Sequence, residues 1–312
     1  MPPQPHETGD SKRLLITGIA GFLGRHLAQR AARDGWDVVG IVRSMPNTTY
    51  TTVRADLAEP VEVRDALEQV APDAAIHCAA AARTNECERF PEVAERDNAR
   101  ASDVVARACG DAAIPLVLCS TDLVFAGDRV GHLHAEDDPV SPVNVYGRSK
   151  LEAERRTHDA YPAAIIARLP LLFGPPAADG APGSFLTGWV EHARAGTALA
   201  LFTDEFRTPL SARDAAAGLL LALGRGAAGR TYHLAGPERV SRYELGRRFA
   251  AVAAESLGFE ADLFTPGLQS DVAMPAPRAP DVSLDGSRAM SELGFAPASL
   301  DDELRWTAVR MA

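Results

Sequence analysis

Lysine is the scarcest charged residue in this chain. It occurs only at Lys12 and Lys150, although Lys and Arg together number 32. Lys presents a compact ammonium that the planar guanidinium of Arg does not imitate. The one lysine in the interior of the sequence, Lys150, is therefore a candidate functional residue.

Cysteine is also rare. The four cysteines, Cys78, Cys87, Cys109 and Cys119, contain no CxxC pair. Zinc sites need tighter clustering of Cys and His, so we expect reduced thiols that pack as small hydrophobic residues in a cytoplasmic protein. The pair His132 and His134 lies in an acid-rich loop, where metal binding is an alternative. We favour a solvated loop there and predict no metal site.

The chain lacks long apolar runs and a basic surplus. No run reaches the roughly 18 residues of a membrane span. Residues 1–12 are polar, contain Pro and lack the apolar core of a signal peptide, so we expect a disordered tail and no membrane contact. The net charge of −10 argues against a nucleic-acid partner. A phosphate-bearing ligand remains compatible, because a few local arginines suffice to bind it.

Short apolar runs alternate with amphipathic stretches along the first half of the chain. This alternation predicts an α/β fold, a Rossmann-type doubly wound parallel sheet with helices on both faces. The 312 residues allow such a domain and a smaller second lobe. The expected strands are 13–17, 37–42, 51–55, 74–78, 114–119 and 163–168, and the expected helices are 22–34, 61–70, 91–109 and 145–160.

The pattern changes after Leu169. A loop over 174–183, rich in Pro, Gly and Ala, and a Pro-rich loop over 267–280 are expected to flank the elements of this part. Ser241 and Glu244 have the spacing of a capping box at a helix start. The expected helices are 185–195, 211–223 and 241–255, and a short strand is expected over 231–234.

A glycine-rich turn follows the first strand, with the sequence Thr17-Gly18-Ile19-Ala20-Gly21-Phe22-Leu23-Gly24. The first Gly allows a tight turn, the second leaves room for a pyrophosphate at the helix N-terminus, and the third allows close packing. A turn without a ligand is the alternative, but its place between strand and helix favours dinucleotide binding. The expected contacts are Gly18, Gly21, Phe22, Leu23, Gly24, and the small residues Ala79 and Ala80 after the fourth strand.

The end of the second strand predicts the cofactor. Sites that prefer NAD place Asp or Glu there to bind the ribose hydroxyl, whereas this chain has Val42-Arg43-Ser44. Arg43 can pair with a 2′-phosphate, which favours NADP(H), with NAD(H) and a solvated Arg43 as the alternative. Asp56 and Leu57 are placed to contact the adenine.

Tyr146 and Lys150 are four residues apart and share one face of the expected helix. A nearby ammonium favours phenolate, so we expect Lys150 to lower the pKa of Tyr146 and to contact the nicotinamide ribose. Thr121, just after the fifth strand, can hydrogen-bond a substrate carbonyl. Asn98 either ties its helix to a strand or relays protons through water to Lys150. The predicted catalytic residues are Thr121, Tyr146, Lys150 and Asn98.

With these motifs the chain, from about Arg13 to its end, resembles the extended short-chain dehydrogenase/reductase family. The motifs are Thr-Gly-x-x-Gly-x-x-Gly, His77-Cys78-Ala79-Ala80, and Tyr146 to Lys150. It looks most like the dTDP-4-dehydrorhamnose reductase branch. The stretches that indicate this branch are Ser120-Thr121-Asp122-Leu123-Val124-Phe125, Asn144-Val145-Tyr146-Gly147, and Asp204-Glu205-Phe206-Arg207-Thr208-Pro209 followed by Asp214.

The resemblance implies reduction, by NADPH, of the 4-keto group of a nucleotide-linked 6-deoxysugar, with Tyr146 protonating the oxygen. It implies an NADP-binding domain over 13–168, to which the chain returns at about 208–236, and a substrate-binding lobe over 169–207 and 237–312. It also implies a homodimer through the helices that carry Asn98 and Tyr146. The implied substrate contacts are Asp122, Asn144, Arg168 and Arg207.

Two departures leave the sugar open. The branch carries a Tyr-Thr pair where this chain has Ala81-Ala82, and Gln where it has Glu205. One alternative is a sugar-nucleotide epimerase, or a reductase of a non-sugar ketone, on the same scaffold. A dehydratase is less favoured, because no Glu follows Asp122. Another alternative is a non-enzymatic NADP-binding subunit like the regulatory subunit of methionine adenosyltransferase.

Overall fold

A seven-stranded parallel sheet forms the centre of the protein, in a computed structural model that describes residues 11–44, 48–178, 181–259 and 263–312. The strand order is β11-β6-β5-β4-β1-β2-β3, which confirms the predicted doubly wound fold. The strands are β1 (Arg13–Thr17), β2 (Asp37–Val42), β3 (Thr51–Arg54), β4 (Ala74–His77), β5 (Leu116–Thr121), β6 (Ile165–Leu169) and β11 (Thr231–His233).

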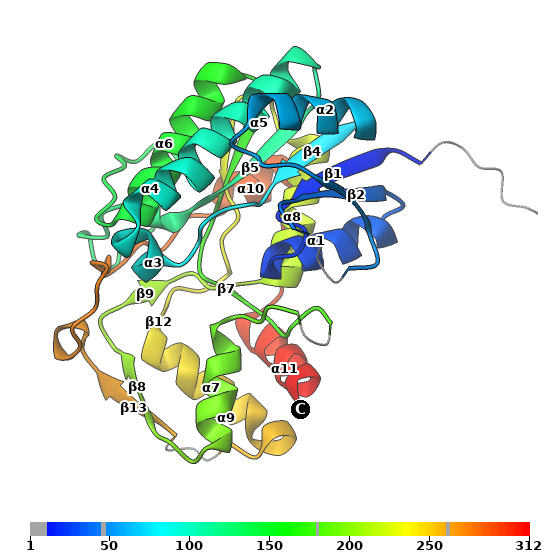
Figure 1. Cartoon of the computed structure of the whole chain (residues 1–312). Helices are drawn as coiled ribbons and strands as arrows, with labels where there is room; N and C mark the ends of the chain where they lie inside the picture. The colour runs from blue at the N-terminus through cyan, green and yellow to red at the C-terminus, as the bar shows by residue number, and fades with distance from the viewer. Residues whose placement is uncertain (1–10, 45–47, 179–180, 260–262) are drawn as a thin grey trace, which may run out of the picture.

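Helices cover both faces of this sheet (Figure 1). The side chains of β1 show why, because alternate residues of a strand point to opposite faces. Leu14 and Ile16 are buried in the core under α1 and α8, whereas Leu15 is buried in the core under α2 and α5. The helices of the first face are α1 (Phe22–Arg33) and α8 (Ala212–Arg225), and those of the second are α2 (Pro60–Val70), α5 (Ala101–Asp111) and α6 (Val145–Ala160).

A smaller lobe lies beside the carboxyl ends of the strands, below the sheet in Figure 1. Its core is formed by aromatic and aliphatic side chains such as Trp189, Phe249 and Phe264. The lobe contains β7 (Leu172–Phe173), α7 (Phe185–Arg194), β8 (Leu199–Phe202), β9 (Phe206–Arg207), β12 (Val240–Ser241), α9 (Arg242–Leu257), β13 (Phe264–Gly267) and α11 (Leu300–Met311). Between β9 and β12 the chain runs back to the sheet through β10 (Leu210–Ser211), α8 and β11.

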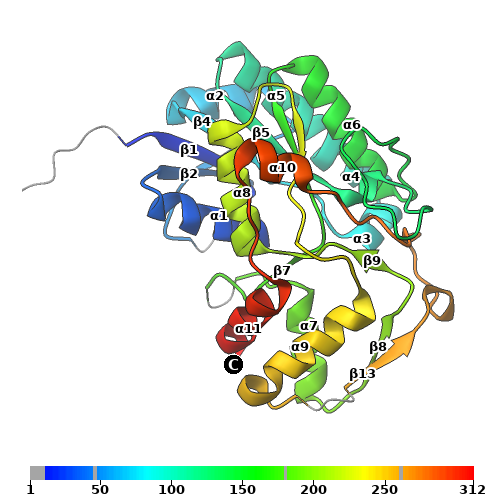
Figure 2. The ribbon, with the colours of Figure 1, turned by 180° about the vertical axis from the view of Figure 1, so that it is seen from behind.

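The C-terminal part differs from the expected division. The helix α10 (Ser287–Leu293) leaves the lobe and packs against α8 and β11, as Figure 2 shows from behind. Ala289, Leu293 and Phe295 join the same core as β1. This second return to the sheet was not predicted, because seven residues are too short to show a clear helical period. The helix α11 then packs on α9 in the lobe.

Several local expectations also changed. The helix expected over 91–109 is α4 (Pro91–Ala94), a π-helical turn (Glu95–Arg100) and α5. The helix α3 (Thr84–Arg89) and the β8–β13 pair were not predicted. The expected disordered tail lies outside the described residues except for Ser11 and Lys12. No helix in the described ranges is both long and apolar enough to cross a membrane.

The predicted helix cap at Ser241 allows a test of the lobe. Its Oγ accepts a hydrogen bond of 3.0 Å from the backbone N–H of Glu244. We expect Ser241→Ala to lower the free energy of unfolding by about 1 kcal/mol, because a backbone donor loses its partner. Urea unfolding measures the loss. Ser256→Ala on the same helix is the control, since the Ser256 Oγ has no hydrogen-bond partner among the described residues. Equal losses in both variants would contradict this role of Ser241.

Candidate active site

The strand order reverses between β1 and β4, and this leaves a crevice at the carboxyl ends of the strands. Two adjoining cavities of about 340 and about 760 Å³ open there. Gly18, Gly21, Cys78 and Ala80 line both of them. Cavities of this size suit small molecules, and one elongated ligand can extend across the glycine turn into both.

The glycine turn brings the first helix as close to the sheet as the backbone allows. Gly18 has φ +70°, and a Cβ there would lie 2.7 Å from the backbone N of Ala79. A Cβ on Gly24 would lie 2.1 Å from the carbonyl oxygen of Gly18. The helix α1 has neither a side-chain cap nor an acidic residue in its first turn. Its free N–H groups can therefore receive an anion such as a pyrophosphate.

The smaller cavity is lined by Arg43, Asp56 and Leu57, as expected for an adenosine site. Arg43 is 62% exposed and donates a 2.9 Å hydrogen bond to Asp97, which also lines the cavity. Asp97 accepts a second bond from Arg96, and Arg96 also pairs with Asp56. The charge of Arg43 is thus partly neutralised. Sequence reasoning missed Asp97, because nothing local marks a helical residue far along the chain.

The larger cavity collects the predicted catalytic residues Thr121, Tyr146 and Lys150. Thr121 ends β5, and its Oγ1 donates to Asp122 at 3.0 Å and accepts from the backbone N–H of Leu123 at 3.2 Å. Lys150 is 2% exposed. In the described part of the chain, no group hydrogen-bonds or ion-pairs with its ammonium. A buried ammonium of this kind can gain its missing partner from a ligand in the cavity.

The electrostatics of Tyr146 differ from the expectation. Burial raises the pKa of Tyr146, and the negative charge of Asp122 raises it further, while a hydrogen bond with Thr121 acts in the opposite direction. The expected lowering by Lys150 is wrong for this structure, because desolvation of the phenolate dominates. Burial also lowers the pKa of Lys150. Tyr146 therefore stays protonated at neutral pH, which is the form that donates a proton.

Asp122 and Asn144 line the same cavity. Asp122 is 4% exposed, and its Oδ2 has no hydrogen-bond partner among the described residues, although Arg207 Nε lies 3.7 Å away. Burial raises the pKa of Asp122 to about 6. Asn144 caps α6 through Gly147 N–H and donates to Pro277 O. The Oδ2 of Asp122 is therefore enclosed and paired with Arg207, whereas Asn144 joins α6 to the loop of Pro277, which lines the cavity.

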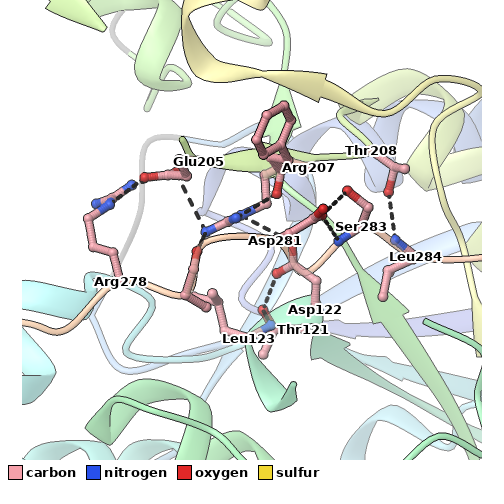
Figure 3. A network of polar contacts seen from close by, with 12 residues as sticks. Thr121, Asp122, Leu123, Glu205, Arg207, Thr208, Arg278, Asp281, Ser283 and Leu284 are labelled. Atoms are coloured by element: carbon pink, nitrogen blue, oxygen red, sulfur yellow. Dashed lines mark hydrogen bonds and ion pairs between the residues drawn. The ribbon is translucent and has the colours of Figure 1, made fainter. Parts of the chain in front are cut away.

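Arginines gather on the lobe side of the cavity (Figure 3). Arg278 donates to both carboxylate oxygens of Glu205 at 2.6 and 2.7 Å, and Arg207 lies 3.6 Å from Glu205. Burial acts to raise the pKa of Glu205, but the arginines outweigh it and lower that pKa. The backbone N–H of Arg242 donates to Glu205 O at 2.9 Å. The enclosed Nη1 of Arg242 has no hydrogen-bond partner in the described ranges. Arg278 and Arg242 were missed, because neither lies in a motif.

Two predicted residues lie outside the cavity. Arg168 is buried and donates to Glu154 at 3.0 and 2.8 Å, with a third bond to Glu136 O. It therefore holds β6 to α6 and does not contact the substrate cleft. Asn98 is also buried, and its amide bonds Ala81 N, Ala81 O and Ser149 Oγ. Its side chain thus ties its helix to the loop after β4 and to α6, not to a strand, and the proton relay to Lys150 stays a prediction.

The raised pKa of Asp122 makes stability depend on pH. Its folded pKa of about 6 exceeds the ordinary value near 3.9. The folded state therefore binds the proton more strongly, and the free energy of unfolding falls as pH rises from about 4 to 6. We expect Asp122→Asn to gain stability relative to the wild type as the pH rises. The free energy of unfolding of the variant minus that of the wild type should be about 2 kcal/mol larger at pH 7.5 than at pH 4. Urea unfolding at both pH values measures this. Asp128→Asn, at an exposed site, is the control, and a pH-independent effect at Asp122 would contradict the assignment.

Comparison with known proteins identifies the family. The model of the RmlD substrate binding domain matches residues 12–311. The chain is 33% identical over 297 residues to the probable low-salt glycan biosynthesis reductase Agl14 of Haloferax volcanii, covering 93% of this chain and 95% of that protein. It is 30% identical over 293 residues to the dTDP-4-dehydrorhamnose reductase of Mycobacterium tuberculosis, covering 93% and 90% of the two chains.

The solved structures agree on the fold. The dTDP-4-dehydrorhamnose reductase of Bacillus anthracis, in complex with NADP, superposes with a TM-score of 0.84 at 21% identity, covering 95% of this chain and 98% of that one. Together with its motifs, these matches show that the chain belongs to the RmlD substrate-binding-domain family, within the extended short-chain dehydrogenase/reductase oxidoreductases.

Proposed function

We propose that the protein is an NADPH-dependent ketoreductase that reduces the 4-keto group of a nucleotide-linked deoxysugar. The observation that carries the proposal is the shared cavity: Thr121, Tyr146 and the unpartnered Lys150 line the same space as the glycine turn. The proton donor Tyr146 would thus lie beside the nicotinamide ring of a cofactor bound at the glycine turn. The reductase names of the two relatives, each matched over nearly its full length, support the same reaction class.

The residues present fit a dinucleotide. The N-terminus of α1 suits the pyrophosphate, the smaller cavity suits the adenosine, and Arg43 at its rim suits a 2′-phosphate. Lys150 would donate to the nicotinamide ribose and so satisfy its buried ammonium. When bound, the reduced cofactor supplies the hydride.

The side chains divide the remaining work. Thr121 Oγ1, which now donates to Asp122, can turn its hydrogen to the substrate carbonyl oxygen and stabilise the charge that develops there. Tyr146 gives that oxygen its phenolic proton and regains one from solvent. Ketone, NADPH and one proton become alcohol and NADP⁺. The raised pKa keeps Tyr146 protonated before the reaction, which is the form that donates a proton.

The larger cavity has the polarity that a nucleotide sugar requires. Four cationic side chains and two carboxylates line this cavity: Arg83, Lys150, Arg207 and Arg278, and Asp122 and Glu205. This leaves a positive surplus suited to a diphosphate. The carboxylate of Asp122, which lines the cavity, can accept a hydrogen bond from a sugar hydroxyl. Ala82 also lines the cavity, where a larger residue would reduce the space beside the sugar.

The first test measures NADPH consumption with a panel of nucleotide-linked 4-keto-6-deoxysugars and non-sugar ketones. We expect turnover with a nucleotide sugar, and a loss of about 100- to 10,000-fold in kcat for Tyr146→Phe with NADPH binding retained. Tyr161→Phe, at the other end of α6, is the matched control and should keep its activity.

Other outcomes separate the alternatives. Turnover of non-sugar ketones alone would contradict the sugar substrate. A tightly retained cofactor without net NADPH consumption would indicate an epimerase. Cofactor binding without any turnover, together with co-purification of a synthetase, would indicate a regulatory subunit.

The pairing of Arg43 with Asp97 gives a second prediction about the cofactor. Arg43→Ala should weaken NADPH binding about 10-fold relative to NADH, because the 2′-phosphate loses its cation (~1.4 kcal/mol). Asp97→Asn should shift the preference the other way, by up to about 5-fold, because an exposed ion pair contributes at most about 1 kcal/mol. Fluorescence titration of both dinucleotides measures the ratios. Equal changes for NADH and NADPH would show that Arg43 does not read the phosphate.

A further inference from the structure

A second group of chemically active side chains lies outside both cavities, on the loop between β5 and α6. His132, His134 and Asp138 each offer one atom that could bind a metal ion, and these atoms all lie within 4.8 Å of one another. His132 Nε2 is 2.7 Å and His134 Nδ1 is 3.8 Å from Asp138 Oδ2. None of the three residues lines the catalytic crevice.

His134 is held rigidly in place. It is 2% exposed and stacks on Phe125 with ring centroids 4.3 Å apart. Its backbone N–H donates to Ser283 O, and its carbonyl accepts from Asp285 N–H, both at 2.8 Å. Its Nε2 lies 3.3 Å from Asp281 O, a carbonyl that can only accept. Nε2 therefore carries the proton, and Nδ1 presents its lone pair toward Asp138.

The guanidinium of Arg129 already lies beside two of these three ligand atoms. Arg129 Nη2 lies 3.2 Å from Asp138 Oδ2 and 3.4 Å from His134 Nδ1. The side chain of Arg129 is 47% exposed, so it can leave toward solvent without opening the core. The guanidinium of Arg129 thus lies where a metal cation bound to Asp138 and His134 would lie.

In place of the solvated loop expected from the sequence, we propose that His132, His134 and Asp138 bind a divalent first-row transition metal such as Zn²⁺, which displaces the guanidinium of Arg129. Imidazole nitrogens and a carboxylate oxygen suit such ions, with metal–ligand distances of about 2.0–2.2 Å. Tetrahedral geometry then separates the ligand atoms by about 3.4 Å. The separations of 2.7 and 3.8 Å fall on either side of that value. The fourth position is open to water.

Binding requires two small changes. His132, which is 38% exposed, moves its proton from Nε2 to Nδ1 and turns the freed lone pair to the metal. Arg129 swings into solvent. The metal would then hold His132 and Asp138 to His134, whose backbone N–H already donates to Ser283 O in the segment that Figure 3 shows beside Arg207. We expect a stabilising role away from the reacting atoms, independent of the proposed ketoreductase activity.

The test uses the full chain without an affinity tag and stripped of metal by chelation. Calorimetric titration with ZnCl₂ should show one saturable site per chain, and Co²⁺ should give the visible absorption of tetrahedral coordination. His132→Ala and Asp138→Asn should each weaken Zn²⁺ binding at least about 10-fold. Arg129→Ala should tighten it, because the competing cation is gone. His158→Ala, at an exposed site on α6, is the matched control.

The results decide the proposal in either direction. The wild type should gain thermal stability with Zn²⁺, and His132→Ala, measured without metal to verify its fold, should not. Absence of saturable binding would overturn the site. Wild-type affinity in both His132→Ala and Asp138→Asn would overturn it as well. A weaker affinity in His158→Ala alone would place the metal elsewhere.

Discussion

The reversal of strand order at β1 is the constraint on which the rest of the structure depends. Because β2 lies on one side of β1 and β4 on the other, the chain segments that leave β1 and β4 diverge and open a crevice above the sheet. At Gly18 and Gly24 the backbone of the glycine turn lies so close to neighbouring backbone that no Cβ would fit. Thr121 reaches it from the end of β5, and α6 reaches it with Tyr146 and Lys150. A binding site and a reactive centre thus follow from one topological feature.

Buried charge organises the second level of the site. The ammonium of Lys150 is buried without a hydrogen-bond partner among the described residues, in a protein that elsewhere uses Arg. Burial lowers the pKa of Lys150, while Cys119 and then Glu154, one helical turn further along α6, act to raise it. Glu154 is in turn held by Arg168 and Ser120. Removing one partner of a buried ion pair such as Glu154–Arg168 costs several kcal/mol of stability. The Glu154–Arg168 pair therefore fixes α6, and with it Tyr146, against β6.

Local patterns made much of the fold and site predictable, and long-range contacts made the rest unpredictable. The turn from Thr17 to Gly24 and the Tyr146–Lys150 spacing are each read within eight residues, and the structure places both at the crevice. The pairing of Arg43 with Asp97, by contrast, joins segments 54 residues apart. The direction of the Tyr146 pKa shift depends on burial, which sequence spacing does not reveal.

Arg168 illustrates the same limit. The family resemblance implied a substrate contact for this residue, but its side chain turns toward α6 and binds Glu154. The helix α10 could not be predicted from the sequence either, because its seven residues gain their stability from packing on α8 and β11. The homodimer through the helices of Asn98 and Tyr146 stays a prediction, as does the identity of the sugar.

The most direct measurement of the central claim follows the hydride itself. NADPH carrying deuterium at both C4 positions of its nicotinamide would be incubated with a nucleotide-linked 4-keto-6-deoxysugar in a single turnover, and the product analysed by mass spectrometry. The account predicts one deuterium bound to carbon in the sugar, with the hydroxyl hydrogen derived from water through Tyr146. A reduced product that contains no deuterium, or a sugar recovered unchanged while NADPH stays bound, would contradict it.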